Sequence, residues 1–279
     1  MDQLSPLFAR FAPSARVFHT GALCGAVAFP ETDGIGHLHL LRSGTLRVHH
    51  TQGQMLHIAQ PSVLFYPRAL SHTLLADEDA KANLVCAEVE FGRNANNPLV
   101  RALPTHLAIP LDTAPELAPT AELLIAEATQ QQCGRQAALD RLTEYFLILL
   151  LRHLLTSHAL DIGMLAGLAD ARLAKVLTGL HEQPELPWTL DEMARHAGMS
   201  RARFARHFHA TVGSTPMDYL TDWRIGVAQT LLKRGKPLKV VAPEVGYTSL
   251  AALTRVFSKR VGLPPSAWLA ASERAHIDE

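Results

Sequence analysis

Two arginines, Arg206 and Arg255, occupy equivalent places in two copies of one sequence pattern. At about 100° per residue, each lies nearly opposite the apolar anchors of a predicted helix and so points away from the core. An arginine ends in a planar fork of donors that fits O6 and N7 of guanine in the major groove. Exposed arginines on helices are often only solvated, and it is the equivalent placement of these two that favours base recognition.

The pattern that contains these arginines occurs twice between residues 188 and 268. Each copy has four small or aliphatic residues, a glycine, a serine, two apolar anchors, and then a glycine, a proline and an aromatic residue. Aligned positions lie 48 residues apart up to the first glycine and 49 apart from the serine onward, because Thr248 is one extra residue in the second copy. A repeat of this length indicates one supersecondary unit built twice.

The spacing inside each copy is typical of a helix, a short turn and a second helix. Apolar residues at i, i+3, i+4 and i+7 predict one apolar stripe on the first helix, and the glycine predicts the turn. Ser200 and Ser249 are predicted to cap the second helices. Thr189 and Glu192 form the T-x-x-E pattern of a capping box at the start of the first unit. The repeat therefore predicts two helix-turn-helix units.

The second helix of such a unit lies in the DNA major groove. We expect Arg203, Arg206 and Arg255 to read bases or neighbouring phosphates. Ser200, Thr254, Ser258, Lys259 and Arg260 are expected to position the DNA backbone. The full predicted contact set is Ser200, Arg201, Ala202, Arg203, Arg206, His209, Ser249, Leu250, Ala251, Thr254, Arg255, Ser258 and Lys259.

The composition is that of an ordinary soluble globular protein, and 279 residues favour two domains. The formal net charge is zero because 26 basic residues balance 26 acidic ones. The charge is nevertheless uneven: residues 187–270 hold 12 basic and 5 acidic residues, which leaves 14 basic and 21 acidic in the remainder. A basic module joined to an acidic body favours an anionic partner for the module.

The first 17 residues lack the continuous apolar stretch of a signal peptide. The most hydrophobic run, residues 145–151, is far shorter than a membrane-spanning helix. Three cysteines without an export signal favour free thiols in a reducing cytoplasm. We therefore expect a cytoplasmic protein with no membrane partner.

Residues 16–92 are predicted to be β-structure. Short β-branched and aromatic runs separated by Gly, Pro and Asp are typical of a small barrel or sandwich. His37 and His39 alternate along one run and so share one face of a strand. Residues 93–112 are predicted to be loop-rich. The predicted strands are 26–29, 37–41, 45–49, 55–58, 63–66 and 84–91.

This region resembles the cupin barrel in the form found as the sensor half of bacterial regulators. The resemblance rests on an H-x-H strand, His37 and His39, followed by Gly44, and on a P-x-G-x-x-H turn that ends at His72. The family's glutamate ligand after H-x-H is absent and Ala69 replaces the turn glycine, so a full three-His, one-Glu site is not expected. The three histidines remain a candidate ligand set for zinc, nickel or copper. The alternative is that they fill a small barrel and bond to backbone groups.

Cys24 and Cys86 lie among apolar residues of the same region, and Cys133 lies in a polar stretch. Some regulators with this architecture respond to hypochlorous acid or other oxidants through barrel cysteines, which implies a redox role for Cys24 and Cys86. A reactive cysteine needs a lowered pKa and access to solvent, and neither is visible in a sequence. A free cysteine among apolar residues is commonly an unreactive small hydrophobe, so both interpretations stand.

Apolar residues recur with a helical period from residue 115 onward. Helices are predicted over 121–132, 137–159 and 169–183, with a two-glycine linker over 161–168. The helix over 137–159 is apolar over a broad face, which the barrel or a second subunit must cover, and this breadth favours a homodimer. The sequence thus predicts an α+β protein: a cupin-like sensor domain (1–112), a helical linker and dimerisation region (113–168) and a DNA-binding domain (169–279) with helix-turn-helix units at about 188–213 and 237–262.

The duplicated module resembles the DNA-binding domain of AraC/XylS-type transcription regulators over residues 169–270. The resemblance implies a helix over residues 223–234 that joins two helix-turn-helix units, which would enter successive major grooves roughly 34 Å apart. The matching residues include Trp188, Ala197 to Ser200, Phe204, Phe208, Gly213, Pro216, Trp223, Arg224, Gly246, Tyr247, Phe257, Gly262 and Pro265.

The sequence departs from this family at two places. Pro243 falls inside the first helix of the second unit, where it removes one backbone hydrogen bond and favours a kink. The family ends the second unit with tyrosine and arginine, whereas here Trp268 is followed by Leu269, which lacks a side chain for the phosphate contact. We therefore expect the first unit to dominate specific binding and the second mainly to add affinity.

Together these features predict a sequence-specific transcription regulator, not an enzyme, whose barrel senses a signal and adjusts the DNA module. Its expected partners are double-stranded DNA, a second copy of the chain and a small-molecule or oxidant effector, with RNA polymerase as a further candidate. Two alternatives concern the barrel, namely a cupin-type metal-binding enzyme and a cysteine-based oxidant sensor.

Overall fold

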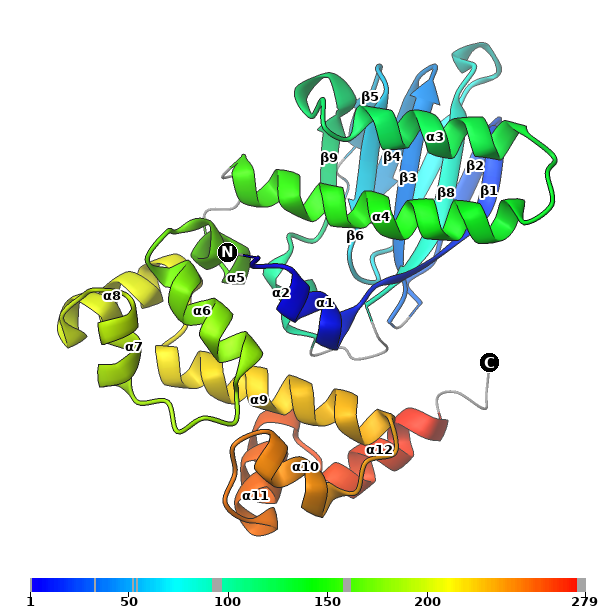
Figure 1. Ribbon diagram of the computed structural model, residues 1–279. Helices are drawn as coiled ribbons and strands as arrows, with labels where there is room; N and C mark the ends of the chain where they lie inside the picture. The colour runs from blue at the N-terminus through cyan, green and yellow to red at the C-terminus, as the bar shows by residue number, and fades with distance from the viewer. Residues whose placement is uncertain are drawn as a thin grey trace. The chain divides into compact units, whose positions relative to one another are not determined.

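The computed structural model describes residues 2–32, 34–51, 53, 55–91, 97–157 and 162–274. The chain divides into two compact units, a barrel unit with the strands and a helical unit with most of the helices (Figure 1). The barrel unit comprises Ala12–Ala95 and Leu103–Ala159. The helical unit comprises Met1–Phe11, Asn96–Ala102 and Leu160–Glu279. This division differs from the three predicted parts, because the helices predicted as a linker group with the barrel.

The barrel unit contains two antiparallel sheets, one in the order β1-β8-β3-β6-β9 and the other β2-β7-β4-β5. The six predicted strands are confirmed to within about two residues, and the structure adds three more. The shortest addition, β9, is a four-residue edge strand inside the segment predicted as loop, too short to show an alternating pattern. The bounds are β1 Ser14–Ala22, β2 Gly25–Phe29, β3 Gly36–Ser43, β4 Leu46–His50, β5 Met55–Ile58, β6 Ser62–Tyr66, β7 His72–Ala76, β8 Asn83–Glu90 and β9 Leu107–Pro110.

The core of the barrel unit lies between the two sheets. Strand β3 is central in its sheet, and its residues from Gly36 to Leu41 are all buried, so both of its faces are covered. The apolar core draws on strands of both sheets and consists of Phe29, Leu41, Leu46, Val48, Leu64, Tyr66, Leu74, Ala76, Ala82, Leu84 and Cys86.

Helices α3 (Ala118–Thr129) and α4 (Arg135–Thr156) lie across the strands (Figure 1). Strand β1 is an edge strand, and α4 bonds to the backbone of its residue Val17. The N–H of Val17 donates to the carboxylate of Asp140 at 2.8 Å, and the Val17 carbonyl accepts from Gln136 at 2.8 Å. Protecting an edge strand in this way makes the helix part of the barrel's structure. The predicted helices are confirmed, each beginning two to three residues early; residues 158–161 lie outside the described residues.

In the helical unit, a short helix followed by a longer one occurs in both copies of the sequence repeat (Figure 1). Its bounds are α1 Ser5–Phe11, α2 Pro98–Ala102, α5 Met164–Ala169, α6 Leu173–Glu182, α7 Leu190–His196, α8 Arg201–Val212, α9 Pro216–Lys233, α10 Leu238–Glu244, α11 Leu250–Val261 and α12 Pro265–Arg274. The first and second predicted helix-turn-helix units are α7–α8 and α10–α11.

The prediction of a linker over 161–168 is wrong for residues 164–168, which form part of helix α5. Gly167 is buried in this helix, and a Cβ there would lie 2.7 Å from Cδ1 of Leu177, so the glycine allows α5 and α6 to approach closely. The predicted helix over 169–183 begins later, because the Asp170 carboxylate accepts from the N–H groups of Arg172 and Leu173 at 2.9 and 3.0 Å. Such a capping interaction starts a new helix at α6.

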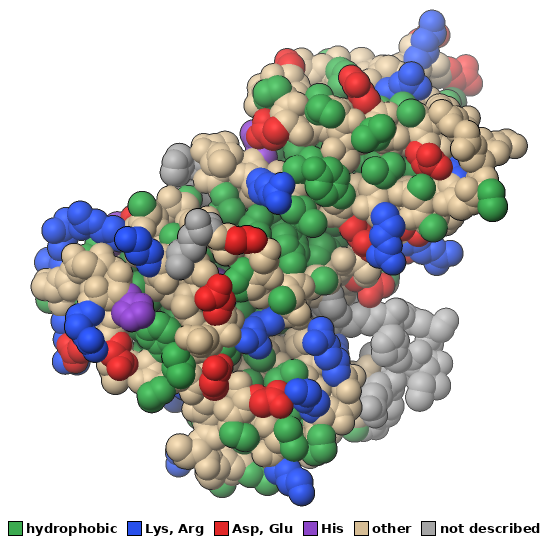
Figure 2. Space-filling view, in the orientation of Figure 1, with side chains coloured by type: hydrophobic (Ala, Val, Ile, Leu, Met, Phe, Trp, Pro, Cys, Tyr) green, Lys and Arg blue, Asp and Glu red, His purple; other side chains and the backbone are tan. Residues whose placement is uncertain are grey.

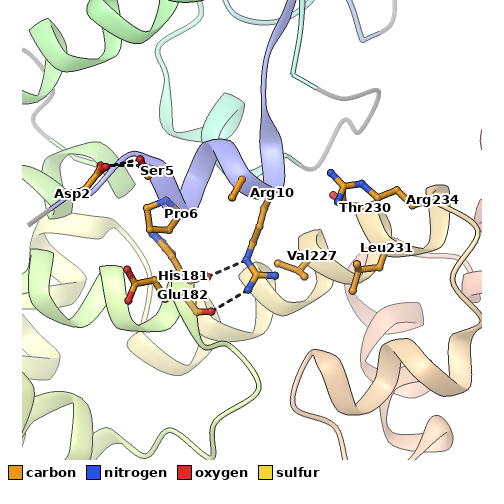
Figure 3. Close-up of a pocket in the computed structure, with 11 residues that line it drawn as sticks. Asp2, Ser5, Pro6, Arg10, His181, Glu182, Val227, Thr230, Leu231 and Arg234 are labelled. Atoms are coloured by element: carbon orange, nitrogen blue, oxygen red, sulfur yellow. Dashed lines mark hydrogen bonds between the residues drawn. The ribbon is translucent and has the colours of Figure 1, made fainter.

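The N-terminal helix α1 packs on the helical unit (Figure 3). Nε and Nη2 of Arg10 donate to the carbonyls of His181 and Glu182, each at 3.1 Å. Phe11 meets Trp223 edge-on with ring centroids 5.2 Å apart. A cavity of about 530 Å³ lies between α1, α6 and α9. These contacts explain why the first eleven residues group with the helical unit, although β1 begins at Ser14.

Candidate nucleic-acid interface

The first unit begins with the predicted capping box. The Thr189 hydroxyl accepts from the N–H of Glu192 at 3.2 Å, and the Glu192 carboxylate accepts from the N–H of Thr189 at 2.8 Å. Gly198 ends α7 with φ +63°, a conformation that residues with a Cβ rarely adopt. Ser200 then occupies the N-cap position of α8, but its hydroxyl accepts no hydrogen bond from the helix.

The second unit repeats this plan with different local contacts. Pro243 lies inside α10 as predicted, and the helix still closes with the N–H of Val245 donating to Val241 at 3.1 Å. Gly246 turns the chain with φ +80°. The hydroxyl of Ser249 accepts from the N–H of Ala252 at 3.1 Å. The predicted serine cap is therefore confirmed at Ser249 and not at Ser200.

The anchors of α8 and α11 are completely buried: Phe204, Phe208, Leu253 and Phe257 have 0% exposure. The predicted contact residues lie on the other faces. Those that are exposed are Ser200, Arg201, Ala202, Arg203, Arg206, His209, Ser249, Leu250, Ala251, Arg255 and Lys259, whereas Thr254 and Ser258 are half-buried. The predicted orientation of both helices is thus confirmed, and the contact of these residues with DNA stays a prediction.

The arginines on these faces differ in their partners. Arg203, Arg206 and Arg255 make no side-chain hydrogen bond or ion pair within the described part of the chain. Arg260 behaves differently, because it pairs with Asp218 and Asp222 of α9. It therefore ties α11 to α9, whereas the sequence placed it at the DNA backbone. Figure 2 shows Lys and Arg side chains gathered over α7 and α8.

Helix α9 joins the two units. It was expected over 223–234 but spans Pro216–Lys233. The early start has a local cause: the Thr215 hydroxyl accepts from the N–H of Asp218 at 3.2 Å, and Pro216 follows at the first helical position. At 18 residues, the helix is about 27 Å long.

The predicted histidines of the barrel lie together. Nε2 of His39 and Nε2 of His72 are 2.9 Å apart, and the ring of His37 stacks on His39 with centroids 5.9 Å apart. The Leu70 carbonyl, which only accepts, lies 2.7 Å from Nδ1 of His72. Nδ1 of His72 therefore carries the proton, and His39 donates from Nε2 to His72. Burial lowers the pKa of His72 to about 4 and that of His39 well below 6.5.

This arrangement does not fit the predicted metal site. Within the described residues, no group of three or more His, Cys, Asp or Glu side chains is placed to hold a metal ion. The Nε2 atoms of His39 and His72 bond to each other, and Nδ1 of His37 is buried without a partner. The spacing in the sequence thus indicates that the rings lie together, but not which partner each nitrogen takes.

Further polar rings in this interior were not predicted from the sequence. His50 lies 3.0 Å from the Tyr66 hydroxyl, and Tyr66 stacks on His72 with centroids 3.8 Å apart. The ring of His106 lies tilted against that of His50, with centroids 4.6 Å apart. Tyr66 is buried within a predicted strand and His50 directly follows one, and a polar or aromatic residue on an inward face is the signal that would have identified them.

The predicted redox cysteines lie in different environments. Cys24 is exposed, Cys86 is buried in the barrel core, and both are free thiols. Burial raises the pKa of the Cys86 thiol to about 12. Because the thiolate is the reactive form, Cys86 is placed as an unreactive core residue. Cys133 is also free and exposed, as predicted.

None of the helices in the described residues is long and apolar enough to cross a membrane.

Comparison with known proteins assigns both units. Residues 2–156 match the cupin family model, and residues 193–271 match a helix-turn-helix domain model. A putative AraC-like transcription regulator of Streptomyces lividans is 36% identical over 189 residues, 65% of this chain and 61% of that protein. The RCS-specific HTH-type transcriptional activator RclR of Escherichia coli is 26% identical over 95% of this chain and 96% of its own length. The crystal structure of the AdpA DNA-binding domain with a target DNA aligns at 32% identity and TM-score 0.35, covering 37% of this chain and 92% of that one.

A two-sheet barrel and two helix-turn-helix units on one connecting helix define a mixed α and β protein with a duplicated helix-turn-helix module. The chain belongs to the cupin family through residues 2–156, and its helical unit carries an AraC-type helix-turn-helix domain. It spans about three fifths of the length of the Streptomyces lividans relative.

Proposed function

We propose that this protein is a sequence-specific transcription regulator that binds double-stranded DNA through α8 and α11, with the barrel unit receiving the signal. One observation carries the proposal. Two helices at equivalent places in a repeat bury apolar anchors, and each exposes an arginine, Arg206 or Arg255, without a partner in the described chain. An unpaired guanidinium keeps its donors available for a guanine edge. Relatives named as transcription regulators support the same function.

The exposed residues divide into two roles. Arg203, Arg206 and Arg255 read base edges or the phosphates beside them, because their side chains are long and have no intramolecular partner. Lys259 and the serines at the starts of the two helices position the DNA backbone. Arg260 is removed from this set, because its guanidinium is engaged by two carboxylates of α9.

The test is a binding titration of DNA from upstream of the protein's own gene with Arg206→Ala and Arg255→Ala. Loss of a base contact should cost about 1–3 kcal/mol and relax specificity at one base position. Lys175→Ala is the matched control, because Lys175 is exposed on α6 and lies outside the proposed interface. Wild-type affinity and specificity in both arginine variants would remove these residues from the interface.

We also propose that the protein forms a homodimer through α3 and α4. Leu123 on α3 and Tyr145 on α4 are 56% and 48% exposed, so both helices present a large apolar side chain to solvent that a second subunit could cover. Leu147 and Leu151, which widened the apolar face in the sequence, are buried and do not support the proposal. Sedimentation analysis should give a dimer that Leu123→Glu and Tyr145→Glu convert to monomer; a wild-type monomer would end the idea.

A second candidate concerns the signal: a cysteine-based response to oxidants. The RCS-specific activator among the relatives favours it, and the exposed Cys24 offers an accessible thiol. The burial of Cys86 argues against a thiolate at that position. The experiment compares Cys24→Ser with Cys86→Ser in an oxidant-response assay. A full response in the Cys24 variant would exclude this thiol as the sensor.

The cupin-type metal-binding enzyme is the weaker alternative. The orientation of His39 and His72 disfavours it, as does the absence of a suitable ligand group among the described residues. Metal analysis of the purified protein decides whether the barrel histidines bind a metal ion or only fill the interior. A stoichiometric transition metal that is lost in His39→Ala would revive the metal site.

A further inference from the structure

Arg224 lies in the middle of α9 and reaches the chain that enters the first helix-turn-helix unit. Its Nε donates to the carbonyl of Pro184, and its Nη2 donates to the carbonyl of Leu186, both at 2.7 Å. The same Leu186 carbonyl accepts from the N–H of Trp188 at 2.8 Å, and Thr189 then caps α7. The guanidinium therefore fixes the segment from which the first unit starts.

The turn of the second unit closes on the same guanidinium. Gly246, between α10 and α11, has φ +80°, and a Cβ there would lie 2.6 Å from Nη2 of Arg224 and 2.9 Å from the Pro184 carbonyl. The neighbouring Tyr247 ring has its centroid 5.7 Å from Cζ of Arg224, within the range of a cation–π contact. One side chain thus contacts the entry of the first unit and the turn of the second.

The second unit has a separate attachment to α9. Arg260 of α11 pairs with Asp218 and Asp222, which fixes α11 on the connecting helix whether or not Arg224 is present. The first unit continues into α9 through residues 213–215. What Arg224 adds is the link between the two units: Pro184 and Leu186 on one side, and Gly246 and Tyr247 on the other.

The chemistry of this junction favours arginine. The two acceptors are neutral carbonyls two residues apart, and the planar guanidinium donates to one from Nε and to the other from Nη2. A lysine would keep the charge but carries all its donors on one nitrogen, without the planar fork that serves both carbonyls beside the Tyr247 ring. The glycine at 246 leaves the space that the guanidinium fills.

We propose that Arg224 is a positioning residue that fixes the angle between the two helix-turn-helix units and so determines the half-site spacing that the protein accepts. The proposal rests on the proposed DNA-binding function and assigns a specificity role to a residue that touches no base. A rigid junction makes binding of the second unit intramolecular, because the first unit delivers α11 at one distance and angle. A loose junction lowers this effective concentration and accepts other spacings.

The first experiment measures binding of Arg224→Gln and Arg224→Lys to a natural site, to each half-site alone, and to sites lengthened or shortened by one base pair. Half-site affinity should stay at the wild-type value, while full-site affinity should fall roughly ten- to a hundredfold. The loss that wild type suffers on altered spacing should become smaller in both variants. Arg234→Gln is the matched control, because Arg234 is exposed at the end of α9 and its side chain has no partner in the described chain.

The second experiment needs no DNA. Spin labels at Ala210→Cys on α8 and Ser266→Cys on α12, in a chain whose native cysteines are replaced, report the distance between the first unit and the helix that packs on α11 through Trp268 and Phe257. The distance distribution should broaden in Arg224→Gln and remain narrow in Arg234→Gln. Circular dichroism of each variant at the measuring temperature shows that its helices are folded.

The outcomes separate the two proposals. Equal losses on half-sites and full sites, with unchanged spacing preference and a narrow distance distribution, overturn the positioning role. Broadening in a protein whose wild type binds no specific DNA overturns the proposed function and leaves the junction standing. Gly246→Ala, which pushes on the same contact from the other side, should reproduce the broadening; a narrow distribution there contradicts the assigned junction.

Discussion

Histidine 181 makes the stability of the helical unit depend on pH. Its side chain is completely buried, stacked on Trp223 with ring centroids 3.9 Å apart, and its Nε2 lies 2.6 Å from the Tyr219 hydroxyl. Its Nδ1 is buried without a partner. Burial, together with the nearby Arg10 cation, lowers the pKa of His181 to about 3. The folded unit therefore keeps this imidazole neutral.

The direction of this pH dependence follows from the pKa of His181 in the unfolded and in the folded chain. The unfolded chain takes up a proton near the ordinary pKa of 6.5, whereas the folded chain does so only near pH 3. Between these values the unfolded state binds more protons than the folded state. His181 therefore does not lower the free energy of unfolding above about pH 6.5, and lowers it progressively as the pH drops toward 3. At about pH 5, roughly 1.5 units below the ordinary value, the loss from this one group is about 2 kcal/mol.

Urea unfolding followed by tryptophan fluorescence measures this loss, because all three tryptophans lie in the helical unit. Wild type should lose about 2 kcal/mol more between pH 7.5 and pH 5 than His181→Phe, which has no proton to bind. Each protein is compared with itself at two pH values, so a general destabilisation by the substitution cancels. Carboxylates with lowered pKa values, such as Asp170 and Asp218, lose stability at more acidic pH and contribute equally to both proteins. Equal pH dependence in wild type and His181→Phe would refute the reasoning.

Three further predictions concern other groups. Acidification to about pH 5 should also destabilise the barrel unit, because the pKa of His72 is lowered to about 4 by burial; His72→Gln should show a smaller loss of β-sheet circular dichroism over the same range. A thiol reagent at pH 8 should modify Cys24 and Cys133 in the native protein but Cys86 only after unfolding, since Cys86 is buried; mass spectrometry of the labelled peptides checks this. Thr189→Ala should lower the free energy of unfolding of the helical unit by about 1 kcal/mol through loss of the α7 cap, measured by fluorescence in urea at neutral pH.

The helix-turn-helix units could be predicted from the sequence because their information is local. Apolar anchors four residues apart identify the buried face of α8 and α11, and so also identify the exposed face with Arg206 and Arg255. The capping box at Thr189 is contained within four residues. Each of these features depends on helical periodicity alone.

The features that were missed depend on partners distant in the chain. Helix α1 is held by carbonyls of His181 and Glu182, some 171 residues away, and carbonyl groups carry no sequence signature. Helix α5 was predicted as a linker because Gly167 suggests flexibility until its close contact with Leu177 is known. The orientation of His72 could not be predicted for a related reason, since the ring is held by its hydrogen bond to the Leu70 carbonyl.

The two helix-turn-helix units differ from each other, and the sequence predicted only part of this difference. Pro243 was expected to weaken the second unit, yet α10 closes and Ser249 caps α11, whereas Ser200 makes no cap bond at α8. The difference between the units lies elsewhere. Helix α8 exposes two arginines without a partner in the described chain, Arg203 and Arg206, whereas α11 exposes one, Arg255, and uses Arg260 to hold itself on α9. Helix α8 thus keeps more arginines for base edges, and α11 uses one of its own to fix its orientation, which is the division of labour expected if α8 supplies specificity and α11 supplies affinity at a set distance.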